Sequence, residues 1–389
     1  MAKPLSHLLS TCDFGPEEEQ AVIDVVKSKW LSVGERTAEF ERSFAEMAGA
    51  HYAVATSSCT AALHLALLAL RVGPGDEVLV PSYTFVATAN PILYVGATPV
   101  FVDICGQDDL NLDPSDLSEK IGPRAKAIIV VHIGGFLADM NQIMAIAERH
   151  GLSVVEDASH AVGAQYVTEG PYQGRSAGSI GSIGCFSFFA NKNLVTGEGG
   201  MAITNDPDLA HRIRLGRSHG MTKTSWDKAG GHAVDYDIED VGYNYRPTEL
   251  TAALGLVQLR KLTAGNLRRQ ELATRYREAL AAETKVTVPF QERLAGSSHH
   301  IFPVLIDNPD SRNLVRKRLK DRGIQTSVHY PPVHHFTHYR RQCPQTRLPR
   351  TDDAASREIT LPLHPLMTGQ DVDFIAREFA AALKNEIET

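Results

Sequence analysis

The segment CFSFFANKNLVTGEGG, residues 185–200, places a lysine between a short apolar run and a glycine-rich turn. Residues 185–188 and 201–204 are expected to form two strands, because short apolar runs bounded by turn residues are typical of buried strands. Lys192 lies between them. In such apolar surroundings its ammonium can lose hydration, which lowers the pKa and favours the nucleophilic amine. A surface lysine at the end of a strand is the alternative that this segment leaves open.

Short apolar runs also alternate with helical patterns on the N-terminal side of this segment. The expected strands are residues 77–80, 99–102, 127–131 and 152–155, and the expected helices are residues 61–70, 91–94 and 140–149. This alternation is typical of the α/β class, in which a mainly parallel sheet carries helices on both faces. Ligands of such sheets bind at the carboxyl ends of the strands. Functional side chains are therefore expected in the loops after Val54, Pro81, Val131, Val155 and Phe188.

The pattern changes in the last third of the chain. Residues 254–280 are rich in Arg, Lys, Glu and Ala, and we expect long helices there that lead into a smaller α+β domain. Its expected elements are a strand at 300–306, a helix at 311–322, a strand at 325–329 and a closing helix at 372–383. We therefore expect an N-terminal segment and large domain in residues 1–255 and a small C-terminal domain in residues 256–389.

Composition narrows the class of protein. The 389 residues are 43% hydrophobic, which is enough for a sizeable core, and the net charge of −7 comes with no basic block. Nucleic acid and anionic membranes are therefore not expected as partners. The N-terminus lacks the apolar run of a signal peptide, and no apolar stretch is long enough to span a bilayer. Five scattered cysteines without a CxxC pair suit a reducing cytoplasm and argue against disulfides or structural zinc.

Two further segments carry candidate chemistry. Asp157 follows an expected apolar strand, and a buried carboxylate needs a partner such as a protonated ring nitrogen. The alternative is a cap for the following turn. Residues 55–60, ATSSCT, precede an expected helix whose free N–H groups can bind an anion such as phosphate, with Ser58 and Thr60 as added donors. A plain N-cap is the alternative there.

Nucleotide-binding motifs of the common kinds are missing from the sequence. There is no GxxxxGK[ST] segment, and Gly178, Gly181 and Gly184 do not form a GxGxxG that opens a helix. A nucleotide hydrolase and a dinucleotide-binding enzyme are therefore excluded.

Together the candidate segments form an ordered set that resembles the sugar aminotransferase family named after DegT, DnrJ and StrS. The resemblance extends from about residue 14 to residue 383. Its matching stretches are WLS at 30–32, PSYTF at 81–85, PVFVD at 99–103, EDA at 156–158, FSF at 186–188 with Lys192, GEGG at 197–200, GYNYR at 242–246 and HY at 329–330. So many matches in the same order make the resemblance specific.

The resemblance implies a pyridoxal-5′-phosphate (PLP)-dependent enzyme with the aspartate-aminotransferase type of fold, working as a homodimer. It implies that Lys192 carries PLP as a Schiff base and that Asp157 pairs with the pyridine nitrogen. Phosphate contacts are implied for the seat Ser58, Cys59 and Thr60 and for Ser187. Relatives usually have Gly-Thr where this chain has Cys59-Thr60, so the loop must form without a positive φ at Cys59.

The resemblance also implies contacts to the rest of the cofactor. Phe85 would stack on the ring, and His160, at a position that is often Gln, would hydrogen-bond near the ring hydroxyl. Asn244 would reach the phosphate of the neighbouring subunit's cofactor, so that the active sites are shared in the dimer. Taken without the resemblance, Phe85 could be ordinary core packing, His160 a hydrogen-bonded core histidine and Asn244 a turn residue.

The C-terminal part holds a run of histidines. This run resembles a metal-binding tract and consists of His329, His334, His335 and His338. The stretch around His329 and Tyr330 instead matches a family segment near the substrate, so we expect these two residues to shape the substrate pocket. No metal site is expected.

The expected activity follows from the resemblance. An amino acid, L-glutamate, would leave its amino group on the cofactor as pyridoxamine phosphate, and a nucleotide-linked keto-sugar, a dTDP-4-keto-6-deoxyhexose, would take it up in amino-sugar or antibiotic biosynthesis. One alternative is a PLP-dependent sugar dehydratase, but those relatives replace the lysine with His. The other is a regulator that binds PLP or a sugar nucleotide without turnover. The presence of both Lys192 and Asp157 argues against this alternative.

Overall fold

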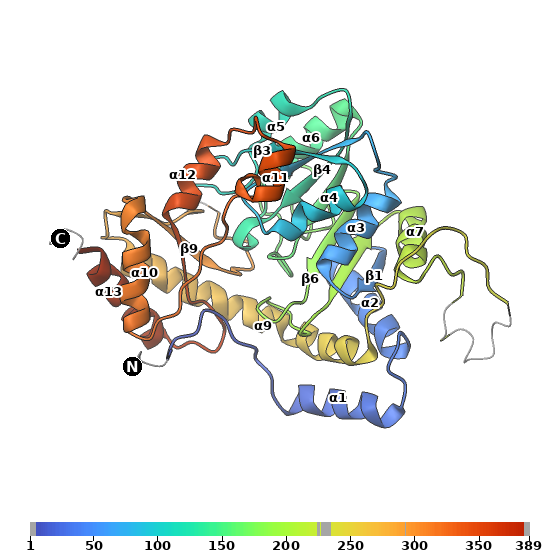
Figure 1. Cartoon of the computed structure of the whole chain (residues 1–389). Coiled ribbons are helices and arrows are strands. Elements are labelled where there is room, and N and C mark those ends of the chain that lie inside the picture. The colour runs from blue at the N-terminus through green and yellow to red at the C-terminus, as the bar shows by residue number, and fades with distance from the viewer. Residues whose placement is uncertain (1–4, 224–225, 227–234, 292, 385–389) are drawn as a thin grey trace.

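The computed structural model describes residues 5–223, 226, 235–291 and 293–384, which form a large and a small β-sheet joined by one long helix (Figure 1). This helix, α9 (Glu249–Leu280), spans 32 residues and passes beneath the large sheet to reach the small one. Long helices were expected in this region, and the structure has a single continuous one. In the described part of the chain, no helix combines the length and apolar character needed to cross a bilayer.

The large sheet contains seven strands in the order β1-β7-β6-β5-β4-β2-β3. Strands β2 to β6 run parallel, whereas β7 is antiparallel to both of its neighbours. The expected α/β fold with a mainly parallel sheet is therefore confirmed. The strands are β1 (Tyr52–Thr56), β2 (Glu77–Pro81), β3 (Thr98–Val102), β4 (Ala125–Val131), β5 (Ser153–Asp157), β6 (Ile183–Ser187) and β7 (Gly200–Thr204).

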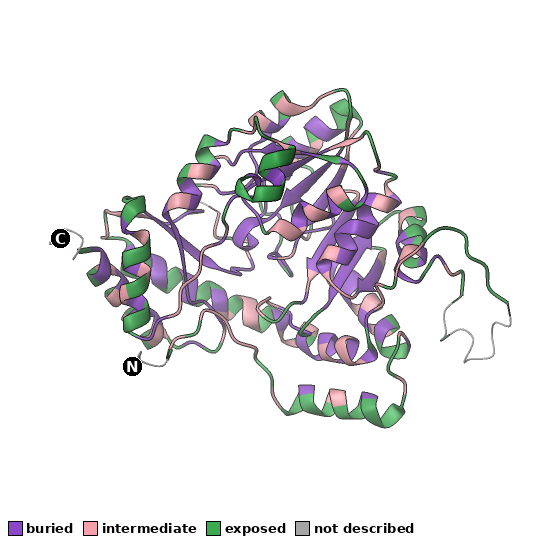
Figure 2. Ribbon diagram, viewed as in Figure 1, coloured by how far each residue is buried: buried purple, intermediate pink, exposed green. Residues whose placement is uncertain are grey.

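Helices cover both faces of this sheet, and successive strand residues point to opposite helical layers. In β4, Ile128 and Val130 pack with the layer formed by α2 (Glu35–Ala48), α5 (Pro114–Lys120), α6 (Met140–His150) and α9. Ala127 and Ile129 pack with the layer formed by α3 (Cys59–Ala69), α4 (Asn90–Tyr94) and α7 (Pro207–Arg217). The strands are consequently buried on both faces (Figure 2), which explains their continuous apolar sequences.

The small sheet is antiparallel and consists of β8 (Val286–Thr287), β9 (Phe302–Ile306) and β10 (Glu358–Leu361). It packs with the C-terminal half of α9, including Leu272 and Tyr276, and with α10 (Arg312–Asp321) and α13 (Gly369–Lys384). The expected division after residue 255 falls inside α9 and stays a prediction. The other helices are α1 (Pro16–Ser28), α11 (Thr337–Gln342), α12 (Pro349–Arg357) and the 3₁₀ turns η1 (Val86–Thr88), η2 (Ile133–Gly135), η3 (Pro309–Ser311) and η4 (Val333–His335).

One expected strand is wrong. Residues 325–329 form no strand, because their backbone groups have partners other than a ladder. The N–H of Gln325 donates to the His7 carbonyl at 2.9 Å, and the N–H of His329 donates to the Glu358 carboxylate at 2.8 Å. A single bridge between Ser327 and Thr360 remains. Strand β10, which sequence analysis did not expect, pairs with β9 in the small sheet.

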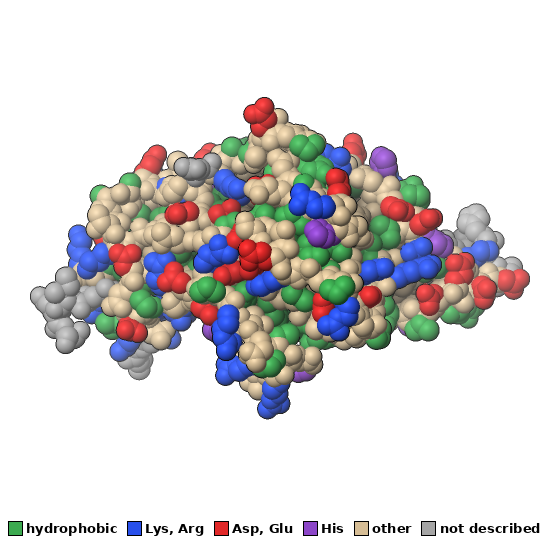
Figure 3. Space-filling view, turned by 90° about the horizontal axis from the view of Figure 1, so that it is seen from above, with side chains coloured by type: hydrophobic (Ala, Val, Ile, Leu, Met, Phe, Trp, Pro, Cys, Tyr) green, Lys and Arg blue, Asp and Glu red, His purple; other side chains and the backbone are tan. Residues whose placement is uncertain are grey.

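The surface carries charges of both signs. Figure 3 shows acidic and basic side chains interspersed over the face seen from above, with hydrophobic side chains between them. This distribution matches a composition in which 22% of residues are charged and the net charge is −7.

Replacing Glu249 by alanine is expected to lower the free energy of unfolding by about 3 kcal/mol. Glu249 is buried at the start of α9, and its carboxylate accepts hydrogen bonds from the backbone N–H groups of Gly34, Arg36 and Thr37 and from the Thr37 hydroxyl at 2.6–2.9 Å. The variant would leave these donors at the start of α2 without their acceptor. Denaturant unfolding of the two proteins measures the difference.

The matched control is Glu271→Ala on the same helix. Glu271 is exposed and, among the residues that the structure describes, pairs only with Arg268 at 2.8 Å, so its loss is expected to cost less than about 1 kcal/mol. Equal losses for the two variants would contradict the role of Glu249 as the anchor of α2.

Candidate active site

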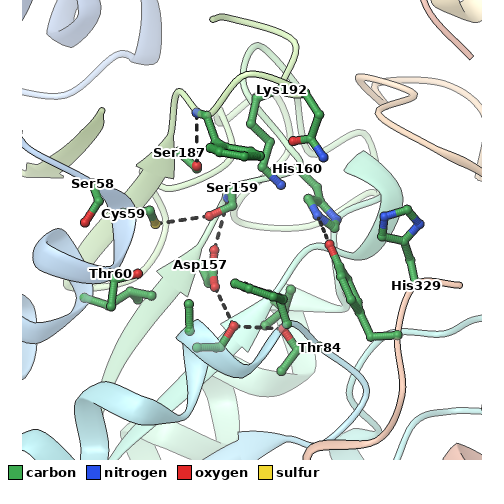
Figure 4. A pocket seen from close by; sticks show the side chains of 18 of the residues that line it. Ser58, Cys59, Thr60, Thr84, Asp157, Ser159, His160, Ser187, Lys192 and His329 are labelled. Atoms are coloured by element: carbon green, nitrogen blue, oxygen red, sulfur yellow. Dashed lines mark hydrogen bonds between the residues drawn. The ribbon is translucent and has the colours of Figure 1, made fainter. Parts of the chain in front are cut away.

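A cavity of about 440 Å³ opens where several strands of the large sheet end (Figure 4). Loops after β1, β2, β5 and β6 line it, as the rule for open parallel sheets predicts, and residues 329–330 close it from the side of the small sheet. All the expected site residues except Asn244 line this cavity. They are Ser58, Cys59, Thr60, Phe85, Asp157, His160, Ser187, Lys192, His329 and Tyr330.

Lys192 extends into the cavity from the loop after β6 (Figure 4). Burial of its amine lowers the pKa to about 8, although nearby Asp157 and Cys59 act in the opposite direction. The next residue fixes the loop, because the Asn193 amide donates to the Asn266 side chain of α9 and to the Ser298 carbonyl, both at 2.8 Å. Lys192 thus lines the cavity with an amine of lowered pKa, and the alternative of a surface lysine is wrong.

Asp157 is the last residue of β5 and is only 5% exposed. One carboxylate oxygen accepts from the Thr88 hydroxyl at 2.8 Å, and the other accepts from the Ser159 backbone N–H at 3.1 Å. The Thr88 hydroxyl is itself 2.8 Å from that of Thr84. This network holds the carboxylate at the cavity wall. No helix begins directly after Asp157, so the capping alternative describes only its contact to Ser159.

The N-terminus of α3 forms another part of the wall. Ser58 is the N-cap, and its hydroxyl accepts from the Ala61 N–H at 3.2 Å, so the capping alternative holds for this residue. Cys59 begins the helix without a positive φ, as its side chain requires. Strand β7 passes very close to this turn: a Cβ on Gly200 would lie 2.4 Å from the Ser58 carbonyl carbon. The N–H groups of the first turn and the Thr60 side chain therefore form a compact seat suited to an anion.

An aromatic and histidine wall lies on the other side of the cavity. Phe85 is 57% exposed, so it is not ordinary core packing, and its ring centroid lies 6.0 Å from that of Tyr330. The Gly134 N–H donates to His160 Nδ1 at 3.3 Å, which places the imidazole proton on Nε2, 2.8 Å from the Tyr330 hydroxyl. Burial, with added effects of Lys192 and His329, lowers the pKa of His160 well below its usual value. His160 is thus a neutral donor to Tyr330.

Asn244 lies elsewhere. It is exposed, forms a single bridge with Ser218 and does not line the cavity of its own chain. Its neighbours Tyr243 and Tyr245 stack with ring centroids 5.1 Å apart. The contact expected for Asn244 involves a neighbouring subunit, and it stays a prediction.

The four histidines of the C-terminal run lie in different parts of the structure. His329 lines the cavity, whereas His334 and His335 lie 3.3 and 3.0 Å from the carboxylate of Asp352. These three side chains form the one group of potential metal ligands found in the described residues. His334 Nδ1 also lies 2.7 Å from the Ser82 hydroxyl, and His338 instead contacts Gln342.

Several residues that line the cavity were not expected from the sequence. Thr84 and Thr88, which orient Asp157, sit in and just after the quoted stretch PSYTF, and their spacing of four residues across the η1 turn is the only local signal. Asn191 precedes Lys192, lines the cavity and has a buried Oδ1 without a hydrogen-bond partner in the described part of the chain. An unpartnered amide next to the lysine points to a ligand contact.

The residues present fit PLP. The α3 N-terminus offers an anion seat for the phosphate, Phe85 offers an aromatic face, Asp157 offers a buried carboxylate for a ring nitrogen, and Lys192 offers an amine. These groups surround one cavity of about 440 Å³, which is large enough for a cofactor and part of a substrate.

Comparisons with known proteins agree with this arrangement. The spore coat polysaccharide biosynthesis protein SpsC of Bacillus subtilis is 43% identical over 366 residues, covering 92% of each chain. The sugar aminotransferase Spr1654 of Streptococcus pneumoniae, solved in PLP and pyridoxamine-phosphate forms, matches the latter form at 30% identity with a TM-score of 0.89 over 97% of this chain and 99% of its own. DesI, solved in the presence of its TDP-sugar product, matches at 33% identity with a TM-score of 0.86 over 99% of this chain and 94% of its own.

The model of the DegT/DnrJ/EryC1/StrS aminotransferase family matches residues 13–380. This range contains both sheets, all of α9 and every residue of the cavity wall. The resemblance and the fold expected from the sequence are thereby confirmed. The chain belongs to the DegT/DnrJ/EryC1/StrS family of sugar aminotransferases, enzymes that use PLP as their cofactor.

Proposed function

We propose that this enzyme transfers an amino group from L-glutamate to the keto group of a nucleotide-linked sugar, a dTDP-4-keto-6-deoxyhexose, with pyridoxamine phosphate as the carrier between the two half-reactions. One observation carries the proposal: a lysine with a lowered pKa and a buried carboxylate line the same cavity in a member of this family. The first property suits the amine for covalent and proton-transfer chemistry, and the second suits the carboxylate for holding a cationic ring.

Each cavity residue has a proposed role. Lys192 holds the cofactor covalently and Asp157 pairs with its ring nitrogen. The phosphate is bound by Ser58, Cys59, Thr60 and Ser187, and in the dimer by Asn244 of the neighbouring subunit. Phe85 stacks on the ring and His160 hydrogen-bonds near its hydroxyl, while His329 and Tyr330 contact the substrate.

When bound, PLP supplies an electron sink that stabilises negative charge at the substrate carbon. The protein supplies the proton transfers. The Nζ amine of Lys192 would take a proton from the substrate carbon as a base, and the resulting ammonium would give that proton back as an acid. A pKa near 8 suits both tasks at neutral pH, because the amine exchanges its proton readily in either direction.

Two relatives support a sugar-nucleotide acceptor. DesI was solved with its TDP-sugar product, and SpsC carries a name that refers to polysaccharide biosynthesis. We propose that this chain likewise works in the cytoplasm, as a homodimer with shared active sites, on a route to an amino sugar of a polysaccharide or antibiotic. Lys192 in the cavity favours this function over a sugar dehydratase, and the presence of Asp157 in the same cavity favours turnover over a binding role.

A substrate panel tests the proposal. The purified protein should be yellow, and the colour should fade when L-glutamate is added. The amine-loaded protein should then regain its colour with one member of a set of nucleotide keto-sugars, and NMR of the product should locate the new amino group. A colour that ignores every amino donor would favour the binding protein, and loss of a sugar hydroxyl without amination would favour the dehydratase.

The pH dependence of cofactor capture tests the state of Lys192. Its pKa is lowered to about 8, so the reactive neutral amine becomes abundant as the pH rises through 8. At pH 7 this makes the neutral fraction about 300-fold larger than for a lysine at its usual pKa. After removal of the cofactor, stopped-flow absorbance should show the rate of PLP capture rising up to about pH 8 and then levelling off. Free Nα-acetyl-lysine is the control, and a protein rate that keeps rising to pH 10 would contradict the lowered pKa.

A further inference from the structure

Three buried side chains link the small sheet to the cavity. His329 Nδ1 lies 2.8 Å from the Thr360 hydroxyl, and that hydroxyl lies 2.5 Å from Oε1 of Glu358. The circuit closes through the His329 backbone N–H, which donates to Glu358 Oε2 at 2.8 Å. Glu358 and Thr360 are at most 1% exposed and His329 is 8% exposed. The circuit is therefore shielded from solvent except where His329 borders the cavity.

The direction of these hydrogen bonds depends on the proton of Glu358. An ionised carboxylate can only accept, so the Thr360 hydroxyl must donate to Glu358 and can only accept from His329. His329 Nδ1 then carries the imidazole proton. Burial, assisted by nearby Lys192, lowers the pKa of His329 to about 4, so the ring is neutral and has one N–H. Nε2 is left as a bare acceptor.

The surroundings of His329 indicate that Nε2 can accept a hydrogen bond from a ligand. His329 lines the large cavity, and it shares a small adjoining pocket with Asn191, His300 and Thr360. The Oδ1 atom of Asn191, which lines both spaces, is buried and has no hydrogen-bond partner in the described residues. Two acceptors on one wall suit a group that donates hydrogen bonds.

We propose that Glu358 in its ionised form, acting through Thr360, is a positioning residue that keeps the proton of His329 on Nδ1 and so makes Nε2 an acceptor for a hydrogen-bond donor of the substrate. This donor is the ammonium of the amino acid or a hydroxyl of the sugar. The part of the inference that concerns substrate rests on the proposed function, whereas the direction of the relay rests on the three side chains alone.

Glu358→Gln reverses the relay without changing its size. The His329 backbone N–H still needs an acceptor, so the amide oxygen must face it and the amide NH₂ must face Thr360. Thr360 then accepts from Gln and donates to Nδ1, which moves the imidazole proton to Nε2. Thr360→Val breaks the relay, and Thr360→Ser is the matched control that keeps the hydroxyl.

Neutron diffraction on deuterium-exchanged crystals of the full-length holoenzyme reads the relay directly. At pH 9 we expect the deuteron on Nδ1 of His329 in the wild type and in Thr360→Ser, and on Nε2 in Glu358→Gln. A deuteron on Nε2 in the wild type at pH 9, or on Nδ1 in the Gln variant, would overturn the proposal. This readout needs no substrate, so it decides about the relay even if every keto-sugar fails as an acceptor.

The pH dependence of the wild-type protein provides a second test of the relay. Burial raises the pKa of Glu358 to about 8, against the effects of Thr360, the His329 N–H, Arg312 and Arg316. Tyr83 and Tyr330 also face this carboxyl and have raised pKa values, so they stay neutral at pH 6 and pH 9. At pH 6 the protonated Glu358 can donate to Thr360, and we expect the wild-type deuteron to move to Nε2. In Glu358→Gln it should stay on Nε2 at both pH values.

Kinetics identify the ligand group. With the two half-reactions measured separately at pH 9, Glu358→Gln and Thr360→Val should raise the KM for one substrate about tenfold, with kcat changed less than about threefold. Thr360→Ser should stay within about twofold. A raised KM in the glutamate half-reaction would identify the ammonium of the amino acid as the donor to His329. A raised KM in the sugar half-reaction would identify a hydroxyl of the sugar as that donor. A loss of kcat and thermal stability with both KM values unchanged would show a merely structural role. If the Gln variant does not fold, the Val and Ser variants still decide.

Discussion

Replacing Lys192 by alanine should lower the rate of transamination by at least about 10⁴-fold and should remove the yellow colour of the holoenzyme. The variant loses the amine that holds the cofactor and the group that moves the substrate proton. No other lysine or arginine lines the cavity in the described part of the chain, and the nearby imidazoles of His160 and His329 have pKa values well below neutral. No neighbouring side chain can therefore supply the amine.

The matched control is Lys317→Ala, which removes an exposed lysine from α10 and should leave activity unchanged. Adding methylamine to Lys192→Ala should restore part of the activity, because a small primary amine can enter the space left by the side chain. Turnover in the alanine variant without added amine would contradict the assignment of Lys192. Equal unfolding midpoints for the variant and the wild type would exclude general misfolding as the cause of the loss.

The strands of the large sheet could be predicted because each lies between two helical layers. Strand β4, for example, is buried on both faces, so it appears in the sequence as an unbroken apolar run. The antiparallel direction of β7 has no such local signature, since it depends on which neighbours the strand pairs with. Residues 325–329 show the same limit. Their side chains suit a strand, but their backbone groups are taken by the N-terminal segment and by Glu358, neither of which is near in sequence.

The candidate site was predictable to the extent that its residues end strands or begin helices. Asp157 ends β5, Thr60 lies in the first turn of α3 and Lys192 lies in the loop after β6, so general rules for open sheets and helix N-termini direct attention to them. The groups that orient them could not be found this way. Thr88 reaches Asp157 across 69 residues, and Glu358 reaches His329 across 29 residues, so each pair exists only in the folded chain.

Asp157→Asn should reduce kcat by about 10²- to 10³-fold, an effect of the size that follows loss of one electrostatic contact to the reacting group. The substitution keeps the volume of the side chain and an oxygen that can accept from the Ser159 N–H or the Thr88 hydroxyl. It removes the negative charge that would hold a proton on the ring nitrogen. Because the electron sink depends on that proton, catalysis should suffer far more than binding of the cofactor.

Thr88→Val separates charge from position. It removes the hydrogen bond to Asp157 at nearly constant volume and leaves the carboxylate charged. Only the fixed orientation of the carboxylate is lost, so kcat should fall about tenfold. The order wild type, Thr88→Val, Asp157→Asn in single-turnover rates with glutamate is therefore the expected result. Asp157→Asn within tenfold of wild type, or a larger loss for Thr88→Val, would mean that Asp157 acts through packing of the η1 turn. In that case the carboxylate would have no direct part in the chemistry.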